Sequence, residues 1–184
     1  KDVPEEVTEP EVTDSEVKQQ NPIETVNEVQ VLEIAAQQEA AAEQEAAEQA
    51  AAEQASAEQQ LQDFKAAIRT KYDMKEAAFA ANDIEPIITR FYSDDAISTG
   101  PDGTTKIGRA ELRPVYEEVI ASNVRVESIK SVVNGDAGWD WVNFHVTPPA
   151  ESGDEPFTFK MVFLWEKIDG EWWSHGEMYV VGKF

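Results

Sequence analysis

The sequence predicts an α+β fold, in which helices gather on one face of an antiparallel sheet and a long helix comes first. Three observations predict it. The stretch from Pro22 to about Ala81 consists mainly of helix-forming residues. From residue 123 onward, apolar side chains recur at every second position, which is the period of a strand. Turn signals at Asn134-Gly135 and Asp169-Gly170 divide that part into neighbouring strands.

Composition excludes several classes of function. The formal net charge is −22, and residues 1–63 contain 17 acidic and 2 basic residues. Such acidity argues against nucleic acid as a partner and against binding to an anionic membrane surface. There is no cysteine, so disulfides and thiolate ligands are excluded. All five tryptophans lie between residues 139 and 173, which places the core in the C-terminal two-thirds of the chain.

Residues 1–21 are acidic, contain two prolines and have no bulky side chain beyond valine. We expect a disordered tail, or a segment that folds only on a partner. No apolar run is long enough to insert into a bilayer. Because the first residue is Lys1 rather than Met, we expect an N-terminal signal or anchor to have been removed, which would make the protein exported, periplasmic or part of the cell envelope.

Residues 22–63 are expected to form a helical spacer. Asn21-Pro22 is a good helix start, and the pentapeptides AAAEQ, EAAEQ, AAAEQ and ASAEQ follow from residue 40. A five-residue period turns about 140° around a helix at each repeat, so no apolar seam for a coiled coil forms. The segment is therefore interpreted as a solvated single helix. Close packing of its alanines against a partner helix is the alternative.

Residues 64–184 are expected to form the folded domain. Bulky apolar residues at helical spacing continue the first helix to about Ala81. The elements expected next are a short helix at 84–91, a hairpin at 96–99 and 104–107, a helix at 108–121, and strands at 123–133, 138–147, 157–168 and 171–181.

Three motifs in this domain carry a resemblance to a known family. They are AANDIEPI at residues 80–87 with FYSDDA at 91–96, IGRAEL at 107–112 with Tyr116, and KIDGEW at 167–172. In this order and spacing, they resemble the nuclear transport factor 2-like superfamily, and within it the SnoaL-like and ketosteroid-isomerase-like proteins. The resemblance covers about residues 65–184. It implies a cone-shaped fold, with a curved sheet wrapped around about three helices, a pocket at the open end and, in many members, a dimer formed through the sheet.

The resemblance also implies where isomerase residues would lie. The catalytic Asp of those enzymes falls near Gly100, their Tyr near Lys75, and their second Asp around Val162–Leu164. None of the three is kept, so ketosteroid-isomerase chemistry is not expected, and the protein is interpreted as leaning away from an enzyme. We expect no cofactor.

The final strand supplies the candidate pocket residues. Counted from Gly170 as the resemblance implies, the inward row contains His175 and Tyr179. His175, His145 and Tyr179 are the candidates for proton transfer, because histidine titrates near neutral pH. A purely structural role, with one hydrogen bond for each histidine, is the alternative. The expected pocket residues are Trp141, Trp173, His175, Glu177, Tyr179, Tyr72 and Tyr116.

The strand at 157–168 is apolar on both faces, which indicates burial on both. Its row of large side chains is expected to form a dimer interface, and a second helical layer is the alternative. The row consists of Phe157, Phe159, Met161, Phe163 and Trp165. A metal site built from His145, His175 and Glu177 is conceivable by ligand type, but no metal is expected because nothing fixes its geometry.

Two classes of function remain open. The first is a non-catalytic interaction or assembly module, held on an acidic helical tether and docking on a protein partner or on a second copy. The second is a small-molecule enzyme or binder, in which an apolar pocket holds a hydrophobic ligand and His175 transfers a proton.

Overall fold

The computed structural model describes residues 22–184, so the tail expected at residues 1–21 lies outside the described part. Two compact units are distinguished, one up to Ala51 and one from Ala52 to Phe184. The described part of the first unit is helix alone. No helix among residues 22–184 combines the length and the apolarity needed to cross a membrane.

Helix α1 (Pro22–Ala81) begins at the predicted proline and ends where Asn82 adopts the left-handed conformation, with φ of 53°. From residue 27 to residue 60 every side chain is exposed, including the apolar Val29, Val31, Leu32 and Ile34. From residue 40 to residue 59 the Ala, Glu and Gln repeats offer no apolar face. Burial starts with the bulky stripe, of which Phe64, Ile68 and Tyr72 are almost wholly inaccessible. The C-terminal part of α1 is therefore held by packing, whereas its first part depends on helix propensity.

The next elements are short. Helix α2 (Glu85–Arg90) is followed by β1 (Tyr92–Thr99), β2 (Thr105–Ile107) and α3 (Gly108–Val119). Strand β1 starts four residues earlier than the sequence predicts, because its first residues pair with the last strand of the sheet. Predicted and observed boundaries of α3 differ only at its C-terminal end.

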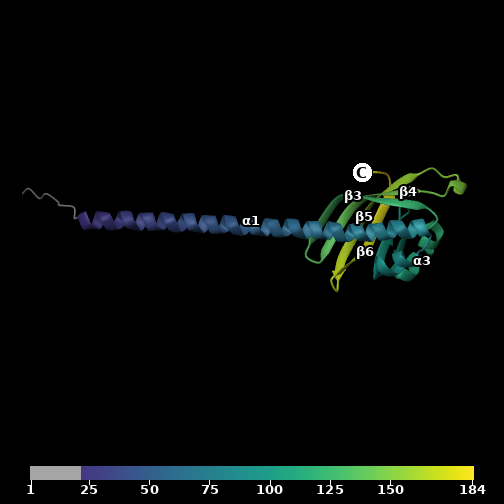
Figure 1. Cartoon of the computed structure of the whole chain (residues 1–184), viewed down its shortest axis with the longest axis horizontal. Helices are drawn as coiled ribbons and strands as arrows, with labels where there is room; N and C mark the ends of the chain where they lie inside the picture. The colour runs from purple at the N-terminus through teal and green to yellow at the C-terminus, as the bar shows by residue number, and fades with distance from the viewer. Residues whose placement is uncertain (1–21) are drawn as a thin grey trace, which may run out of the picture. The chain divides into compact units, whose positions relative to one another are not determined.

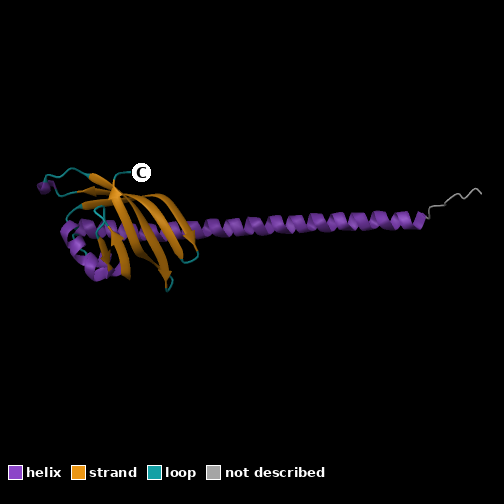
Figure 2. Cartoon of the chain, turned by 180° about the vertical axis from the view of Figure 1, so that it is seen from behind, coloured by secondary structure: helices purple, strands orange, loops and turns teal. Residues whose placement is uncertain are grey.

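The long strands are β3 (Asn123–Asn134), β4 (Ala137–Thr147), β5 (Phe157–Ile168) and β6 (Glu171–Val181). A single 3-10 turn, η1 (Ala150–Ser152), lies in the loop between β4 and β5. The six strands form one sheet in the order β2-β1-β6-β5-β4-β3. All neighbours are antiparallel except β1 and β6, which run parallel. Figure 2 shows the strands curving around the helices of the domain.

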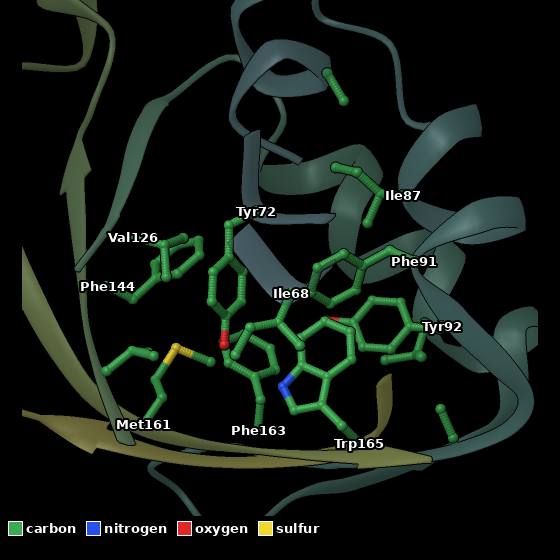
Figure 3. Packing of buried hydrophobic residues seen from close by; sticks show 14 of the residues in the cluster. Ile68, Tyr72, Ile87, Phe91, Tyr92, Val126, Phe144, Met161, Phe163 and Trp165 are labelled. Carbon is green, nitrogen blue, oxygen red and sulfur yellow. The ribbon is translucent and has the colours of Figure 1, made fainter. Parts of the chain in front are cut away.

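The core lies on the concave face of the sheet, where the C-terminal part of α1 and helix α3 pack (Figure 1). Figure 3 shows Met161, Phe163 and Trp165 of β5 pointing toward Tyr72 and Phe91. The Tyr72 ring centre lies 5.4 Å from that of Phe163 and 5.6 Å from that of Trp165. These side chains stabilise the domain through close aromatic packing and apolar burial.

The packing of β5 contradicts the dimer interface that the sequence predicts on this strand. Met161, Phe163 and Trp165 are at most 5% exposed within one chain, so a second copy cannot reach them. Of the five residues predicted for the interface, Phe157 is exposed and Phe159 is half-buried, and both line the cavity described below. The strand is apolar on both faces, as its sequence indicates, but the large aromatic row is the inner one.

Strand β6 contains a β-bulge at His175. Ser174 pairs with Trp165 and Gly176 pairs with Leu164, so His175 is an extra residue without a partner on β5. Side chains on the two sides of a bulge do not follow one alternation. Ser174 and Glu177 are therefore both inward and buried, although three positions separate them.

Candidate functional site

The domain contains an apolar cavity of about 190 Å³ that is partly open to solvent, since Val119 and Phe157 on its wall are 42% and 40% exposed. It lies between α3, the C-terminal part of α1 and the inner faces of β1 and of β3 to β6. Its wall consists of Lys75, Phe79, Ser98, Leu112, Val115, Tyr116, Val119, Ser122, Val124, Phe144, Val146, Phe157, Phe159, Met161, Glu177 and Tyr179. Ten of these are apolar, so most of the wall offers a ligand no hydrogen bond. The polar groups are few, which is typical of small-molecule sites.

A buried polar network forms one end of the cavity. Lys75 Nζ donates a hydrogen bond to the Tyr92 hydroxyl at 2.8 Å. The Tyr92 hydroxyl donates to Glu177 Oε2 at 2.6 Å, and the Ser98 hydroxyl donates to Glu177 Oε1 at 2.8 Å. Tyr92 and Tyr116 also share a hydrogen bond. Since the proton of Tyr92 is directed to Glu177, Tyr116 must be the donor of that bond.

Lys75 is the most unusual member of this network, because its side chain is only 1% exposed. Its Nζ lies 3.9 Å from Glu177 Oε2, too far for a hydrogen bond but close enough for an ion pair. Five aromatic rings surround it, with their centres 4.2 to 5.5 Å from Nζ: Phe91, Tyr92, Tyr116, Phe144 and Phe163. Aromatic faces attract a cation, so the rings partly replace the water that Lys75 has lost.

Burial is the largest cause of the pKa shifts in this network. It lowers the pKa of Lys75 to about 8, although the nearby Glu177 carboxylate acts in the opposite direction. Burial and the charge of Glu177 together raise the pKa of both Tyr92 and Tyr116 well above the usual value. The same two causes raise the pKa of Tyr179 to about 12. Near neutral pH the tyrosines are therefore hydroxyl donors, and Lys75 is the group closest to exchanging its proton.

Four elements bring these groups together. Lys75 is on α1, Tyr92 and Ser98 are on β1, Tyr116 is on α3, and Glu177 is on β6. The resemblance places the lost isomerase tyrosine near Lys75, and Lys75 was not among the predicted site residues. A signal was present: Lys75 continues the inward helical stripe between Tyr72 and Phe79, where an apolar residue is expected.

The predicted pocket row of β6 is divided by the bulge. Glu177 and Tyr179 line the cavity, as does Tyr116 of α3. Trp173 and His175 lie outside it, because the extra residue places them on the other face of the strand. There His175 Nδ1 lies 3.4 Å from Glu166 Oε2 and 3.6 Å from Asp95 Oδ1, and its side chain is 42% exposed.

The other predicted site residues also lie away from the cavity. His145 is on the outer face, where its ring nitrogens contact Thr158 and Glu127, each at 3.0 Å. Trp141 is on that face as well and packs edge-on against Phe184, with 5.8 Å between the ring centres. The two histidines are not brought together, since they contact opposite ends of β5.

Tyr72 belongs to the core rather than to the cavity wall. Its hydroxyl donates to Asp140 Oδ2 at 3.0 Å, and the hydroxyls of Ser128 and Ser131 donate to the same carboxylate at 2.6 and 2.8 Å. Burial raises the pKa of Asp140, and the three hydroxyl donors oppose that effect. No group of three His, Asp or Glu side chains among residues 22–184 is arranged to hold a metal ion.

The curved sheet, the helices on its concave face and the apolar cavity together define a cone-shaped α+β domain. The family model of the SnoaL-like domain matches residues 73–175, which is more than half of the chain. The chain therefore belongs to the SnoaL-like family. A search of the curated proteins found no significant match.

Similar solved structures agree on the fold. A ketosteroid isomerase-like protein from Erwinia carotovora atroseptica is 23% identical, with a TM-score of 0.54 over 65% of this chain and 96% of that chain. A domain of unknown function with a cystatin-like fold from Nostoc punctiforme is 19% identical, with a TM-score of 0.55 over 65% and 78%. An NTF2-like protein of unknown function from Pseudomonas putida is 15% identical, with a TM-score of 0.54 over 64% and 85%. At these identities the likeness concerns the fold alone.

Proposed function

We propose that this domain binds a small, largely apolar molecule in the cavity between α3 and the sheet. The observation that supports it best is an apolar chamber that ends in the buried network of Lys75, Tyr92, Tyr116 and Glu177. Burying a lysine and a carboxylate costs stability unless they are well paired. A binding role accounts for that cost, because a few polar groups in an apolar wall fix the orientation of a ligand.

The hydrogen-bond inventory indicates which polar group the ligand carries. A lysine ammonium has three donors, and only the one directed to Tyr92 has a partner among the described residues. The remaining donors suit an oxygen acceptor, such as a hydroxyl or a carbonyl. A carboxylate would meet the nearby Glu177 as well as Lys75, so it is disfavoured.

Isothermal titration calorimetry with 3-phenyl-1-propanol tests the proposal, since this alcohol joins an apolar body to one oxygen. Val115→Trp places a large side chain in the cavity wall and is expected to weaken binding at least about tenfold, as a clash removes the buried apolar contact. Val180→Trp is the matched control, because Val180 is exposed on the outer face of β6. Equal affinity of both variants and the wild type would contradict the proposal, as would a wild type that does not bind.

A second role, as an interaction module, is favoured by the outer face of the sheet. Register pairs Trp139 with Leu164 and Trp141 with Val162, and Val162 in turn pairs with Met178. Four of these five side chains are 38 to 58% exposed: Trp139, Trp141, Leu164 and Met178. We propose that a second copy of the chain docks on this apolar face, rather than on the inner row of β5, because an exposed patch rimmed by polar residues marks an interaction surface.

Sedimentation velocity tests this second role. Leu164→Lys introduces a charge at the centre of the patch, and it is expected to convert a dimer to a monomer. Val29→Lys is the control, because Val29 is exposed on α1 far from the sheet in sequence. A monomeric wild type at micromolar concentration would exclude the homodimer.

A further inference from the structure

We propose that Lys75 Nζ forms an imine with an apolar aldehyde or ketone bound in the cavity. This inference rests on the proposed ligand binding, since the carbonyl must first reach the buried part of the cavity where Lys75 lies. It assigns Lys75 as the reactive group of the cavity. The histidines that the sequence suggested for proton transfer, His145 and His175, lie outside the cavity. It also narrows the ligand from any small oxygen-bearing molecule to a carbonyl compound.

The geometry leaves the lone pair of the amine free. The single proton of Tyr92 is directed to Glu177, so Lys75 must be the donor in its bond to the Tyr92 oxygen. No described group donates a hydrogen bond to Nζ. A deprotonated Lys75 therefore keeps its bond to Tyr92 while its lone pair remains unshared, and Lys75 itself lines the cavity.

The network also tolerates loss of the lysine charge. Both oxygens of Glu177 already accept hydrogen bonds from neutral hydroxyls, one from Tyr92 and one from Ser98. The carboxylate is thus not left without a partner when Lys75 becomes neutral. Burial lowers the pKa of Lys75 even though Glu177 and the five aromatic rings attract its charged form, and the neutral, desolvated amine is the form that acts as a nucleophile.

The step is a condensation that needs no oxidant or reductant. The amine nitrogen bonds to the carbonyl carbon, and the carbonyl oxygen gains a proton while the nitrogen loses one, which gives a carbinolamine. The hydroxyl group then leaves with a proton as water, and a carbon–nitrogen double bond remains. Tyr116 lines the cavity and is hydrogen-bonded to Tyr92, so its hydroxyl is placed to relay these protons.

The test uses the full chain and 3-phenylpropanal, the aldehyde that corresponds to the alcohol above. The protein is incubated with the aldehyde and sodium cyanoborohydride at pH 8, and peptide mapping locates the reduced adduct. We expect labelling of Lys75 to exceed that of each other lysine by at least about tenfold, because a free lysine is almost wholly protonated at that pH. Labelling of Lys75 should fall roughly 50-fold at pH 6.

Two variants sharpen the result. Lys75→Met is expected to lose the dominant adduct, and Lys71→Met, which removes a lysine from the same helix at a more exposed position, is expected to keep it. An excess of 3-phenyl-1-propanol should suppress labelling at Lys75 and leave the other lysines unaffected. If Lys75→Met does not fold, two measurements on the wild type still test the imine: the dependence of Lys75 labelling on pH, and its suppression by the alcohol.

The outcomes separate the two proposals. Binding of the alcohol without preferential labelling of Lys75 would overturn the imine and leave ligand binding intact. Labelling spread evenly over the lysines would have the same meaning. Absence of both alcohol binding and labelling at Lys75 would overturn both proposals.

Discussion

Replacing Lys75 with methionine should remove a pH-dependent part of the free energy of unfolding. In the folded protein, burial lowers the pKa of Lys75 to about 8 from 10.5 for a free lysine. This difference corresponds to about 3 kcal/mol, since each tenfold change in a protonation equilibrium is worth ~1.4 kcal/mol. At neutral pH the buried ammonium therefore weakens the folded state by roughly that amount relative to alkaline pH.

The sign follows from proton binding. Between pH 8 and 10.5 the unfolded chain holds the lysine proton and the folded protein releases it, so stability rises with pH. The free energy of unfolding therefore increases by about 2 kcal/mol between pH 7 and pH 9.5. The measurement stops at pH 9.5 because the pKa values of the buried tyrosines are raised in the folded protein. Near pH 10 the tyrosines of the unfolded chain ionise while the buried ones do not, so the free energy of unfolding falls again.

The assay is urea unfolding followed by tryptophan fluorescence at several pH values from 7 to 9.5. The quantity of interest is the free energy of unfolding of the wild type minus that of Lys75→Met, which should increase by about 2 kcal/mol across this range. Lys71→Met should show no such increase relative to the wild type. A difference that stays flat with pH would refute the reasoning, whatever the absolute stability of the variant.

Three further predictions concern packing and the site. Gly138→Ala should destabilise the domain by about 1–3 kcal/mol in urea unfolding, because the new Cβ would lie 2.8 Å from Phe64 Cζ and 2.9 Å from the Val132 carbonyl oxygen; unchanged stability would contradict this, since it would require both Phe64 and the backbone of β3 to shift without cost. Asp140→Ala should cost about 2–4 kcal/mol, since three hydroxyl donors lose their buried acceptor, and a loss below ~1 kcal/mol would contradict this. The third prediction concerns the affinity for 3-phenyl-1-propanol, measured by calorimetry. Glu177→Gln should weaken binding about fivefold, because it alters the buried hydrogen-bond network at the cavity, whereas His175→Ala should change the affinity by less than about twofold. A larger loss of affinity in His175→Ala than in Glu177→Gln would place the binding site on the outer face of the sheet.

The fold was largely predictable because strand periodicity and turn chemistry are local signals. The bounds of β5 and β6 follow from period-two alternation on either side of Asp169-Gly170, and they agree with the structure to the residue. The parallel pairing of β1 with β6 was not predictable in this way, because it joins segments far apart in the sequence.

The site was predictable only in part. Tyr116, Glu177 and Tyr179 were expected in a pocket and lie on the cavity wall. His175 was not excluded, because both rows of β6 mix apolar and polar residues, so the sequence does not show where the bulge shifts the alternation. Lys75 was missed because a charged residue on a helix is normally solvated. Its burial depends on partners far apart in the sequence, namely Glu177 and five aromatic rings that come from Phe91, just after α2, and from β1, α3, β4 and β5.

The unpaired position at His175 also means that distances counted along β6 from its turn do not identify inward side chains. If His175 were deleted, Ser174 would directly precede Gly176, and simple alternation would still point Trp172, Ser174 and Glu177 inward. The strand could thus be one residue shorter without any change in the cavity wall. Aligning this region with other sequences therefore requires the pairing partner on β5, rather than the spacing from Gly170, as the reference.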